Sequence, residues 1–268
     1  MLELITLYSG SSGNCVYVSD GTTRLLIDCG VSGKRIEMGL NSIGVAPETV
    51  HGVLLTHEHS DHIASVGILH RRYGWQLYAN RPTWQAAESV VGKYRPDCVR
   101  FFCGDFSIGD ILVTPFAIPH DAAAPVGYRF SQGAGAVSVA TDIGKLTGEL
   151  AEHLSGSDCV LLEANHDEEM LKAGPYPYPL KRRILGERGH LSNENAGRLC
   201  AYLAKTGTKH ILLGHLSVHN NMPELAYQTV LSVMQEQGVT DRATLQVAPR
   251  ERCSVSCRTE DTLCRKSG

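Results

Sequence analysis

The stretch THEHSDH, residues 56–62, is the part of the sequence that decides the fold class. It follows a short apolar run and places three histidines and an aspartate within six consecutive positions. Side chains alternate along the end of a strand, so His57 and His59 point to one side, and the start of the next helix turns Asp61 and His62 towards the same space. Four such side chains suit two adjacent metal ions better than one. A solvated polar loop does not require this composition, so we predict metal ligation.

Three other predicted strands are followed by a side chain that could complete such a site. His120, Asp142 and His215 each come after a run of apolar residues, in a turn that contains glycine or proline. Each alone could be a hydrogen-bonded loop residue. Because loops at strand ends bring functional groups together, the three jointly predict a site of five histidines and two aspartates.

Composition excludes several broad classes of protein. The 268 residues contain 25 Lys and Arg against 28 Asp and Glu, a formal net charge of −3, which is not that of a strongly basic nucleic-acid binder. The hydrophobic fraction of 43% excludes disorder as the main state. No apolar run approaches the ~18 residues that a bilayer span needs, so we expect no membrane segment.

The N-terminus and the cysteines favour the cytoplasm. The first residues, MLELITLYSGSSGN, lack the basic start and long apolar stretch of a secretory signal. The nine cysteines are an odd number, and most lie in apolar strand-like or helical stretches rather than in a short disulfide framework. We therefore expect reduced thiols in a cytoplasmic protein.

Short strands and helices alternate along the chain, which predicts an α/β fold. We expect strands at 4–8, 15–19, 24–28, 53–55, 111–116, 126–130, 137–140, 159–162, 210–213 and 245–247, and helices at about 32–43, 63–73, 82–91, 193–205 and 223–237. Both halves have meander strands followed by helices. This layout predicts two packed sheets with helices outside.

The last residues break this pattern. The segment 249–268 is polar, has no apolar period and is rich in Arg and Cys, so we expect a tail without fixed structure. Its Cys253, Cys257 and Cys264 could bind zinc, but three cysteines without a nearby fourth ligand fit a structural zinc site poorly. We favour free thiols.

The histidine and aspartate pattern resembles the metallo-β-lactamase superfamily. This resemblance rests on HEHSDH followed by His120, Asp142 and His215, and covers about residues 1–248. It implies a single hydrolase domain over 1–248 with a four-layer αββα sandwich, whose dinuclear metal site lies at one edge of the two sheets. Asp28, at the end of LLIDCG, matches the structural aspartate that orients the HxHxDH loop.

The same resemblance implies how the ligands are divided. The first metal would be held by His57, His59 and His120, the second by Asp61, His62 and His215, with Asp142 bridging. No cysteine stands at these positions, which differs from the dizinc lactamases. A bridging aspartate resembles the ligand set of the hydrolase and nuclease branches of the superfamily. Histidine and aspartate ligands suit Zn, Mn and Fe alike, so we expect two divalent ions of one of these metals.

Several further stretches closely resemble the YycJ/WalJ family. They are SGSSGNC (9–15), TDIG (141–144), LLEANHD (161–167), LKRRILGERGHLSNENA (180–196) and LLGHLSVHNN (212–221). The family is viewed as metal-dependent nucleases of the bacterial cytoplasm, in particular 5′ to 3′ DNA exonucleases. The order Glu163, His190, His215 is also similar to tRNase Z, in which a Glu and a His outside the metal shell protonate the leaving oxygen.

These residues permit phosphodiester hydrolysis. Two metals neutralise the anionic substrate and turn a bridging water into a hydroxide nucleophile, with Asp61 as a proton acceptor. His190, supported by Glu163, is our candidate donor of a proton to the leaving alkoxide. The alternatives are a helix-entry residue for His190 and a solvent-facing charge at a strand end for Glu163.

A local basic cluster is our candidate for substrate binding. It comprises Lys181, Arg182, Arg183 and Arg188. Tyr176 and Tyr178 precede it, and such a mixture could hold phosphates and stack bases, although a charge run is usually just a solvated face.

The favoured hypothesis is a dinuclear phosphodiesterase that acts on DNA, with an RNA-processing nuclease as its variant. A thioester or lactone hydrolase would use the same metals without an alkoxide-protonating histidine or a basic groove. A regulatory protein that merely holds metal is a non-enzymatic alternative, against which the complete ligand set argues.

Overall fold

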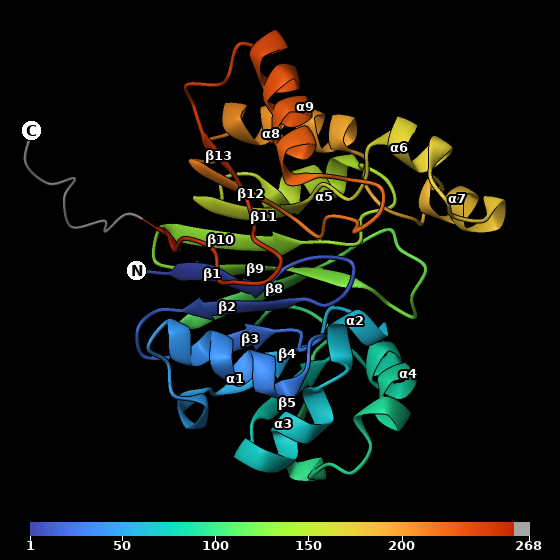
Figure 1. Cartoon of the computed structure of the whole chain (residues 1–268). Coiled ribbons are helices and arrows are strands. Elements are labelled where there is room, and N and C mark those ends of the chain that lie inside the picture. Colours follow the sequence, from blue (N-terminus) through green and yellow to red (C-terminus); the bar gives the residue numbers. More distant parts are fainter. Residues whose placement is uncertain (260–268) are drawn as a thin grey trace, which may run out of the picture.

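The computed structural model describes residues 1–259. Within them, two seven-stranded sheets are packed face to face, and helices cover the outer face of each (Figure 1). The four-layer αββα sandwich that the resemblance implied is therefore confirmed.

The first sheet has the strand order β14-β1-β2-β3-β4-β5-β6. Its strands are β1 (Glu3–Tyr8), β2 (Cys15–Ser19), β3 (Arg24–Ile27), β4 (Gly52–Leu54), β5 (Gln76–Ala79), β6 (Val99–Phe101) and β14 (Cys257–Arg258). The meander β1-β2-β3 is antiparallel, whereas β3 to β6 are parallel. The carboxyl ends of β3 to β6 therefore lie at one edge.

The second sheet has the order β13-β12-β11-β10-β9-β8-β7. Its strands are β7 (Phe106–Ile108), β8 (Ile111–Ala117), β9 (Val126–Gln132), β10 (Gly135–Ala140), β11 (Cys159–Glu163), β12 (His210–Gly214) and β13 (Thr244–Val247). The strands from β7 to β10 are antiparallel and those from β10 to β13 are parallel. Each sheet is thus half meander and half parallel, and the two packed sheets with helices outside that the sequence layout predicted are confirmed.

The helices lie in two outer layers. They are α1 (Gly33–Ser42), α2 (Ser60–Ile63), α3 (Val66–Tyr73), α4 (Arg81–Val91), α5 (Gly148–Leu154), α6 (Glu168–Ala173), α7 (Tyr178–Ile184), α8 (Asn193–Lys205) and α9 (Pro223–Glu236), with 3-10 turns at Pro47–Thr49 and Pro96–Cys98. In Figure 1, α1, α3 and α4 cover the first sheet, and α5, α8 and α9 cover the second.

Strand β2 illustrates why the sheets are buried on both faces. All five of its residues are buried. Val16 and Val18 belong to the apolar core between the sheets, whereas Cys15 and Tyr17 belong to the core between the first sheet and its helices. Because alternate side chains point to opposite faces, a continuous apolar run is what such a strand requires.

Some elements differ from the sequence prediction. The helix predicted at 63–73 is split into α2 and α3 at Ser65, whose hydroxyl donates a 2.6 Å hydrogen bond to the carbonyl of Val31. The short strands β5, β6 and β7 and the helices α5, α6 and α7 were not predicted. Elements of three to seven residues carry too few apolar positions for a clear period.

The segment after residue 248 also differs from its prediction up to residue 259. Leu4 pairs with Cys257 across β1 and β14, and the Thr259 amide donates to the carbonyl of Leu2. The expected tail is therefore wrong for residues 249–259, because pairing with the edge strand β1 satisfies their backbone groups. Cys264 lies outside the described residues. Among residues 1–259, no helix is long and apolar enough to cross a membrane.

Candidate metal centre

The seven predicted ligands lie together at the edge of the sandwich where the strands that precede them end. The histidines and aspartate of THEHSDH follow β4 of the first sheet, whereas His120, Asp142 and His215 follow β8, β10 and β12 of the second. Ligand atoms of His57, His59 and His120 all lie within 4.8 Å of one another. Parallel strands thus bring together residues that are far apart in the sequence.

Three further groups of ligand atoms lie equally close together. One contains Asp61, His62 and His215, and a second places Asp142 with His57 and His62. The third joins Asp142 and His215 to Glu163 and His190. Asp142 therefore lies between the two sets of donors that the resemblance had divided between two ions.

Asp28 and two of the predicted ligands lie at positions where the backbone is strained. Among the described residues, the non-glycine residues with positive φ are Asp28, Asp142 and His215, at 61°, 61° and 55°. This left-handed conformation costs free energy for residues other than glycine, and such strain persists where surrounding contacts enforce it, typically at functional sites. All three residues turn at a strand end into the cluster.

Asp28 holds the THEHSDH segment in place through three hydrogen bonds. Its carboxylate accepts hydrogen bonds from the Thr56 amide at 2.9 Å, the Thr56 hydroxyl at 2.7 Å and His62 Nδ1 at 2.7 Å. His62 Nδ1 then carries the hydrogen, and its Nε2 presents a lone pair 3.2 Å from Asp142 Oδ2 and 3.4 Å from Asp61 Oδ2. These contacts are the ones that the orienting role predicted for Asp28 requires.

Other histidines are oriented in the same way. His120 Nδ1 donates to the Gly189 carbonyl at 2.9 Å, and His215 Nδ1 donates to Glu163 Oε1 at 2.8 Å. Their Nε2 atoms lie 3.4 Å from His59 Nδ1 and 3.5 Å from Asp61 Oδ2. A fixed Nδ1 hydrogen leaves the Nε2 lone pair for a metal, which is the usual arrangement around ligating histidines.

Two buried atoms test whether ions fit this cluster. His57 Nε2 is inaccessible to solvent and has no hydrogen-bond partner, and the equally buried Asp142 Oδ2 has only His62 Nε2 beside it, at 3.2 Å. An unpartnered buried polar atom is costly, so His57 Nε2 requires a partner that the protein does not supply. The residues present therefore fit divalent ions.

The histidines and carboxylates of the cluster shift one another's pKa values. Burial alone would lower the pKa of His62 and of His215, but neighbouring carboxylates raise the pKa of His62 well above its ordinary value and that of His215 to about 10. Burial would raise the pKa of Asp142, but His215, His62 and His57 hold it well below its ordinary value. The histidines and carboxylates of the cluster thus favour one another's charged forms.

Glu163 and His190 form a pair beside the cluster. Glu163, at the end of β11, is completely buried, and its Oε1 accepts from His190 Nδ1 at 2.9 Å as well as from His215. Its Oε2 accepts from the amides of Ile143 and Leu191 at 2.6 and 3.1 Å. Burial raises its pKa, but His190 and the other donors lower it to about 2. The alternative of a solvent-facing charge is excluded.

A cavity of about 210 Å³ opens onto His190 and the cluster. Its lining includes His190, Asp61, Asp142 and His215, together with Arg183 of α7. The cavity is where a substrate can reach the predicted ligands and His190 together.

Comparison with known proteins places the chain in a family. Residues 23–216 match the model of the β-lactamase superfamily domain. The chain is 41% identical over 239 residues to exodeoxyribonuclease YycJ of Bacillus anthracis, covering 88% of this chain and 90% of the relative. It is 43% identical over 234 residues to exodeoxyribonuclease WalJ of Streptococcus pneumoniae, covering 86% and 87%. The chain belongs to the YycJ/WalJ family of the β-lactamase superfamily.

A solved structure supports the fold of this family member. The metallo-β-lactamase fold protein YhfI of Bacillus subtilis superposes with a TM-score of 0.71 at 15% identity, covering 94% of this chain and 98% of that one. At this identity the likeness shows the fold alone.

The basic cluster of this YycJ/WalJ family member is divided. Arg183 reaches the cavity and pairs with Asp121 at 2.5 Å, whereas Arg188 Nε donates to the His120 carbonyl at 3.1 Å and so supports a predicted ligand. Lys181 donates to the carbonyl of Lys172, and Arg182 lies 6.0 Å from the Tyr178 ring. Of the four predicted substrate-binding residues, only Arg183 lines the cavity.

Several cavity residues were not predicted to belong to the site. Ser11, Asn165 and Ser217 line the cavity, and Asn165 Nδ2 donates to the carbonyl of His215 at 3.0 Å. Their signal in the sequence is their place inside the SGSSGNC, LLEANHD and LLGHLSVHNN stretches. Tyr176, noted before the basic cluster, also lines the cavity.

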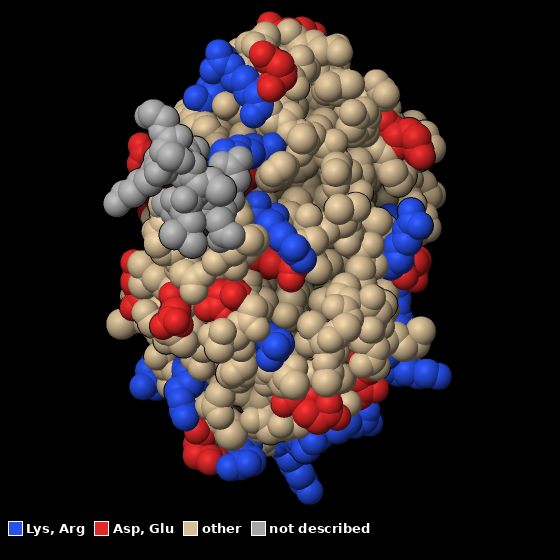
Figure 2. All heavy atoms as spheres, turned by 90° about the vertical axis from the view of Figure 1, so that its left-hand side faces the viewer, with Lys and Arg blue, Asp and Glu red and all other residues tan. Residues whose placement is uncertain are grey.

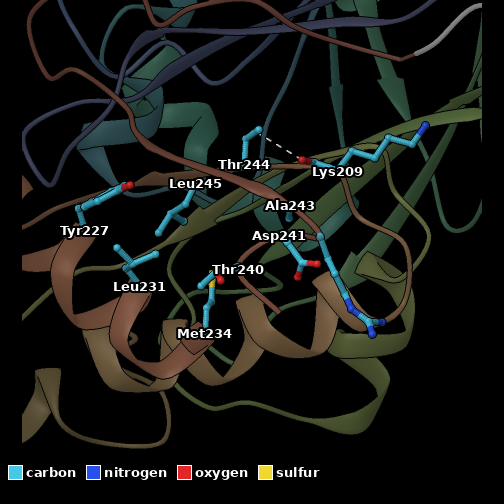
Figure 3. Close-up of a pocket in the computed structure, with 10 residues that line it drawn as sticks. Lys209, Tyr227, Leu231, Met234, Thr240, Asp241, Ala243, Thr244 and Leu245 are labelled. Atoms are coloured by element: carbon cyan, nitrogen blue, oxygen red, sulfur yellow. Dashed lines mark hydrogen bonds between the residues drawn. The ribbon is translucent and has the colours of Figure 1, made fainter. Parts of the chain in front are cut away.

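A further pocket lies away from the metal centre. A polar pocket of about 420 Å³ lies between α9 and β13, lined by Lys209, Tyr227 and Asp241 among others (Figure 3). Lys209 precedes β12 and His215 follows it, so a five-residue strand of roughly 16 Å separates this pocket from the cluster. On the face shown in Figure 2, positive and negative side chains are interspersed and no single charge dominates.

Proposed function

We propose that this protein is a metal-dependent nuclease that digests DNA from the 5′ end. The observation that carries the proposal is a complete set of seven metal-capable side chains in a chain that is 41–43% identical to proteins called exodeoxyribonucleases. We further propose that residues 1–248 contain all the catalytic residues of a domain whose first sheet continues to β14 at Cys257–Arg258. Reduced thiols in the cytoplasm remain our proposal for its setting.

The metal part of the proposal is two divalent ions of zinc, manganese or iron. His57, His59 and His120 would hold one ion, and Asp61, His62 and His215 the other, with Asp142 shared. When bound, such ions supply an activated water and neutralise the charge of a phosphodiester. The unpartnered His57 Nε2 and the buried Asp142 Oδ2 support this assignment.

His190 is proposed to deliver a proton to the leaving oxygen. Its Nδ1 donates to Glu163, so its Nε2 is the nitrogen that can present a proton to a substrate in the cavity. Glu163 holds the ring by one oxygen and is itself held by two backbone amides at the other. A carboxylate fixed in this way orients the imidazole and fixes which ring nitrogen faces the substrate.

Two other side chains have proposed roles at the same cavity. Asp61 lies beside His215 and His62 and would accept the proton that the attacking water loses. Arg183 would bind a substrate phosphate, because its guanidinium lines the cavity and its partner Asp121 is partly exposed.

The first test is digestion of end-labelled nucleic acid. Purified protein, reconstituted separately with Mn and Zn, is incubated with single- and double-stranded DNA and RNA labelled at either end. We expect DNA to be shortened from the 5′ end and RNA to be a poorer substrate. Hydrolysis of a thioester or a lactone, with no cleavage of any nucleic acid, would overturn the proposal.

The second test is metal content. We expect two ions per chain after reconstitution under saturating conditions, measured by plasma mass spectrometry of desalted protein. A content that never exceeds one ion per chain would contradict the dinuclear assignment.

A further inference from the structure

A second pocket lies on the far side of the loop that carries His120. Its volume is about 600 Å³, in the range of small-molecule sites. One wall comes from the two ends of that loop, at 117–118 and 124–126. The facing wall comes from the start of α4 and from the residues after β6. The pocket shares no lining residue with the cavity at the metal centre.

Hydrogen bonds connect the loop that carries His120 to the THEHSDH segment and to the start of α4. The Ala123 amide donates to Glu58 of the THEHSDH segment at 2.8 Å. The Ala124 carbonyl accepts from the Asn80 side chain at 2.8 Å and from the Thr83 hydroxyl at 3.2 Å, both at the start of α4. Ala124 is four residues from His120, so its wall lies within roughly 14 Å of the predicted ligand. A short run of nucleotides can span this distance.

The pocket has a flat aromatic surface with a cation on it. The ring of Phe101 is 43% exposed, and the guanidinium carbon of Arg81 lies 4.6 Å from its centre. The adjacent Phe102 is fixed by stacking on Phe106 at 5.0 Å. Exposed aromatic rings stack nucleobases, and arginine adds both a planar face and a charge for a phosphate.

We propose that this pocket binds one unpaired nucleobase of the DNA strand whose scissile phosphate lies at the metal centre. The base would stack against Phe101 together with the planar guanidinium of Arg81 that lies over its ring, and the charge of Arg81 would hold the adjacent phosphate. The inference rests on the proposed nuclease function. It commits to a nucleotide because the pocket combines an apolar flat surface with a positive charge at its rim, directly beside the loop that carries His120.

The variants for the test are Phe101→Ala and Arg81→Gln. Matched controls are Tyr202→Ala and Arg198→Gln in α8, an exposed aromatic and a cation on an outer helix. Steady-state kinetics are measured on a single-stranded DNA oligonucleotide and on bis(p-nitrophenyl) phosphate, which has no base. We expect KM for DNA to rise roughly 5- to 100-fold in Phe101→Ala, the range that loss of one stacked base implies. kcat and cleavage of the small diester should stay at the wild-type level.

A second measurement begins with the wild-type protein, so its main outcome does not depend on a variant folding. Wild-type protein is given oligonucleotides that each carry one abasic position. We expect one position near the 5′ end to raise KM by a similar factor, and Phe101→Ala to show no further loss with that oligonucleotide, since the two changes remove the same contact. Arg81→Gln should reduce the salt dependence of DNA binding by about one ion.

The outcomes separate the two proposals. If wild-type protein digests DNA but Phe101→Ala behaves like Tyr202→Ala, or no abasic position matters, the base subsite is wrong and the nuclease function stands. If wild-type protein cleaves no nucleic acid, the proposed function fails first.

Discussion

Gly30→Ala should disable the second half of the candidate metal centre without unfolding the protein. A Cβ at Gly30 would lie 1.6 Å from the carbonyl oxygen of Asp61, whereas real Cβ atoms keep at least 3.0 Å from such neighbours. The Asp61 backbone must therefore move by about 1.4 Å. It cannot do so freely, because the Asn14 amide donates to the same oxygen at 2.9 Å and the Cys29 amide donates to the His62 carbonyl at 2.7 Å.

The expected loss follows from this displacement. Metal ligands tolerate errors of about 0.2 Å in distance, and a displacement of about 1 Å at a catalytic group typically costs about 10²-fold in rate. We expect one ion per chain in place of two, and at least a 100-fold lower kcat on DNA, measured by plasma mass spectrometry and by digestion of labelled oligonucleotide.

The control for this prediction is Gly33→Ala, three residues along the chain. A Cβ at Gly33 would meet Leu69 at 3.3 Å, a contact that a small side-chain shift relieves, so this variant should keep both ions and full activity. Circular dichroism checks that both variants are folded. A Gly30→Ala protein with two ions and wild-type kcat would refute the close-contact argument.

Three further predictions concern the same centre. His190→Ala should keep both ions yet lose about 10²- to 10⁴-fold in DNA cleavage, and far less with a nitrophenyl phosphodiester, whose leaving group needs little protonation; equal losses would make His190 structural. Asp28→Asn keeps a residue type that tolerates positive φ but replaces one acceptor oxygen by a donor. We expect the affinity for the second ion, measured by competition with a chelator, to fall 10- to 100-fold. Unchanged affinity would contradict the orienting role of Asp28. His62 and His215 have raised pKa values without ions and carry protons at pH 7. Metal binding should therefore release these protons and should weaken as the pH falls. Calorimetry in buffers of different ionisation enthalpy measures the proton release, and binding at pH 7 without it would contradict this prediction.

The main outline of the fold and the cluster could be predicted because their signals are local. THEHSDH lies within one turn after one strand, and His120, Asp142 and His215 each follow an apolar run. The rule that loops at strand ends bring functional groups together was enough to group them in one site.

The surroundings of Glu163 could not be predicted, because they depend on distant segments. Two of its donors are the amides of Ile143 and Leu191, 20 and 28 residues away, and they decide that the carboxylate is buried rather than exposed. The sequence shows only a charge at a strand end, for which solvent exposure is the commoner outcome.

The basic cluster and the last described residues show the same limit. Arg183 and Arg188 have opposite tasks because α7 and the loop after it contact Asp121 and the His120 carbonyl, contacts 62 and 68 residues apart. Thr259 reaches Leu2 across 257 residues. Local composition cannot reveal such long-range pairing.

Because the donors for each proposed ion come from both sheets, neither sheet alone could bind either ion with its full set. Metal would cross-link the two halves of the sandwich, and its binding free energy would count towards their association. An ion at 100 times its Kd adds about 2.7 kcal/mol to the stability of a folded chain. Metal supply would therefore govern how long the protein survives heat or proteases as well as how fast it works, and chelation should loosen the edge where the two sheets meet.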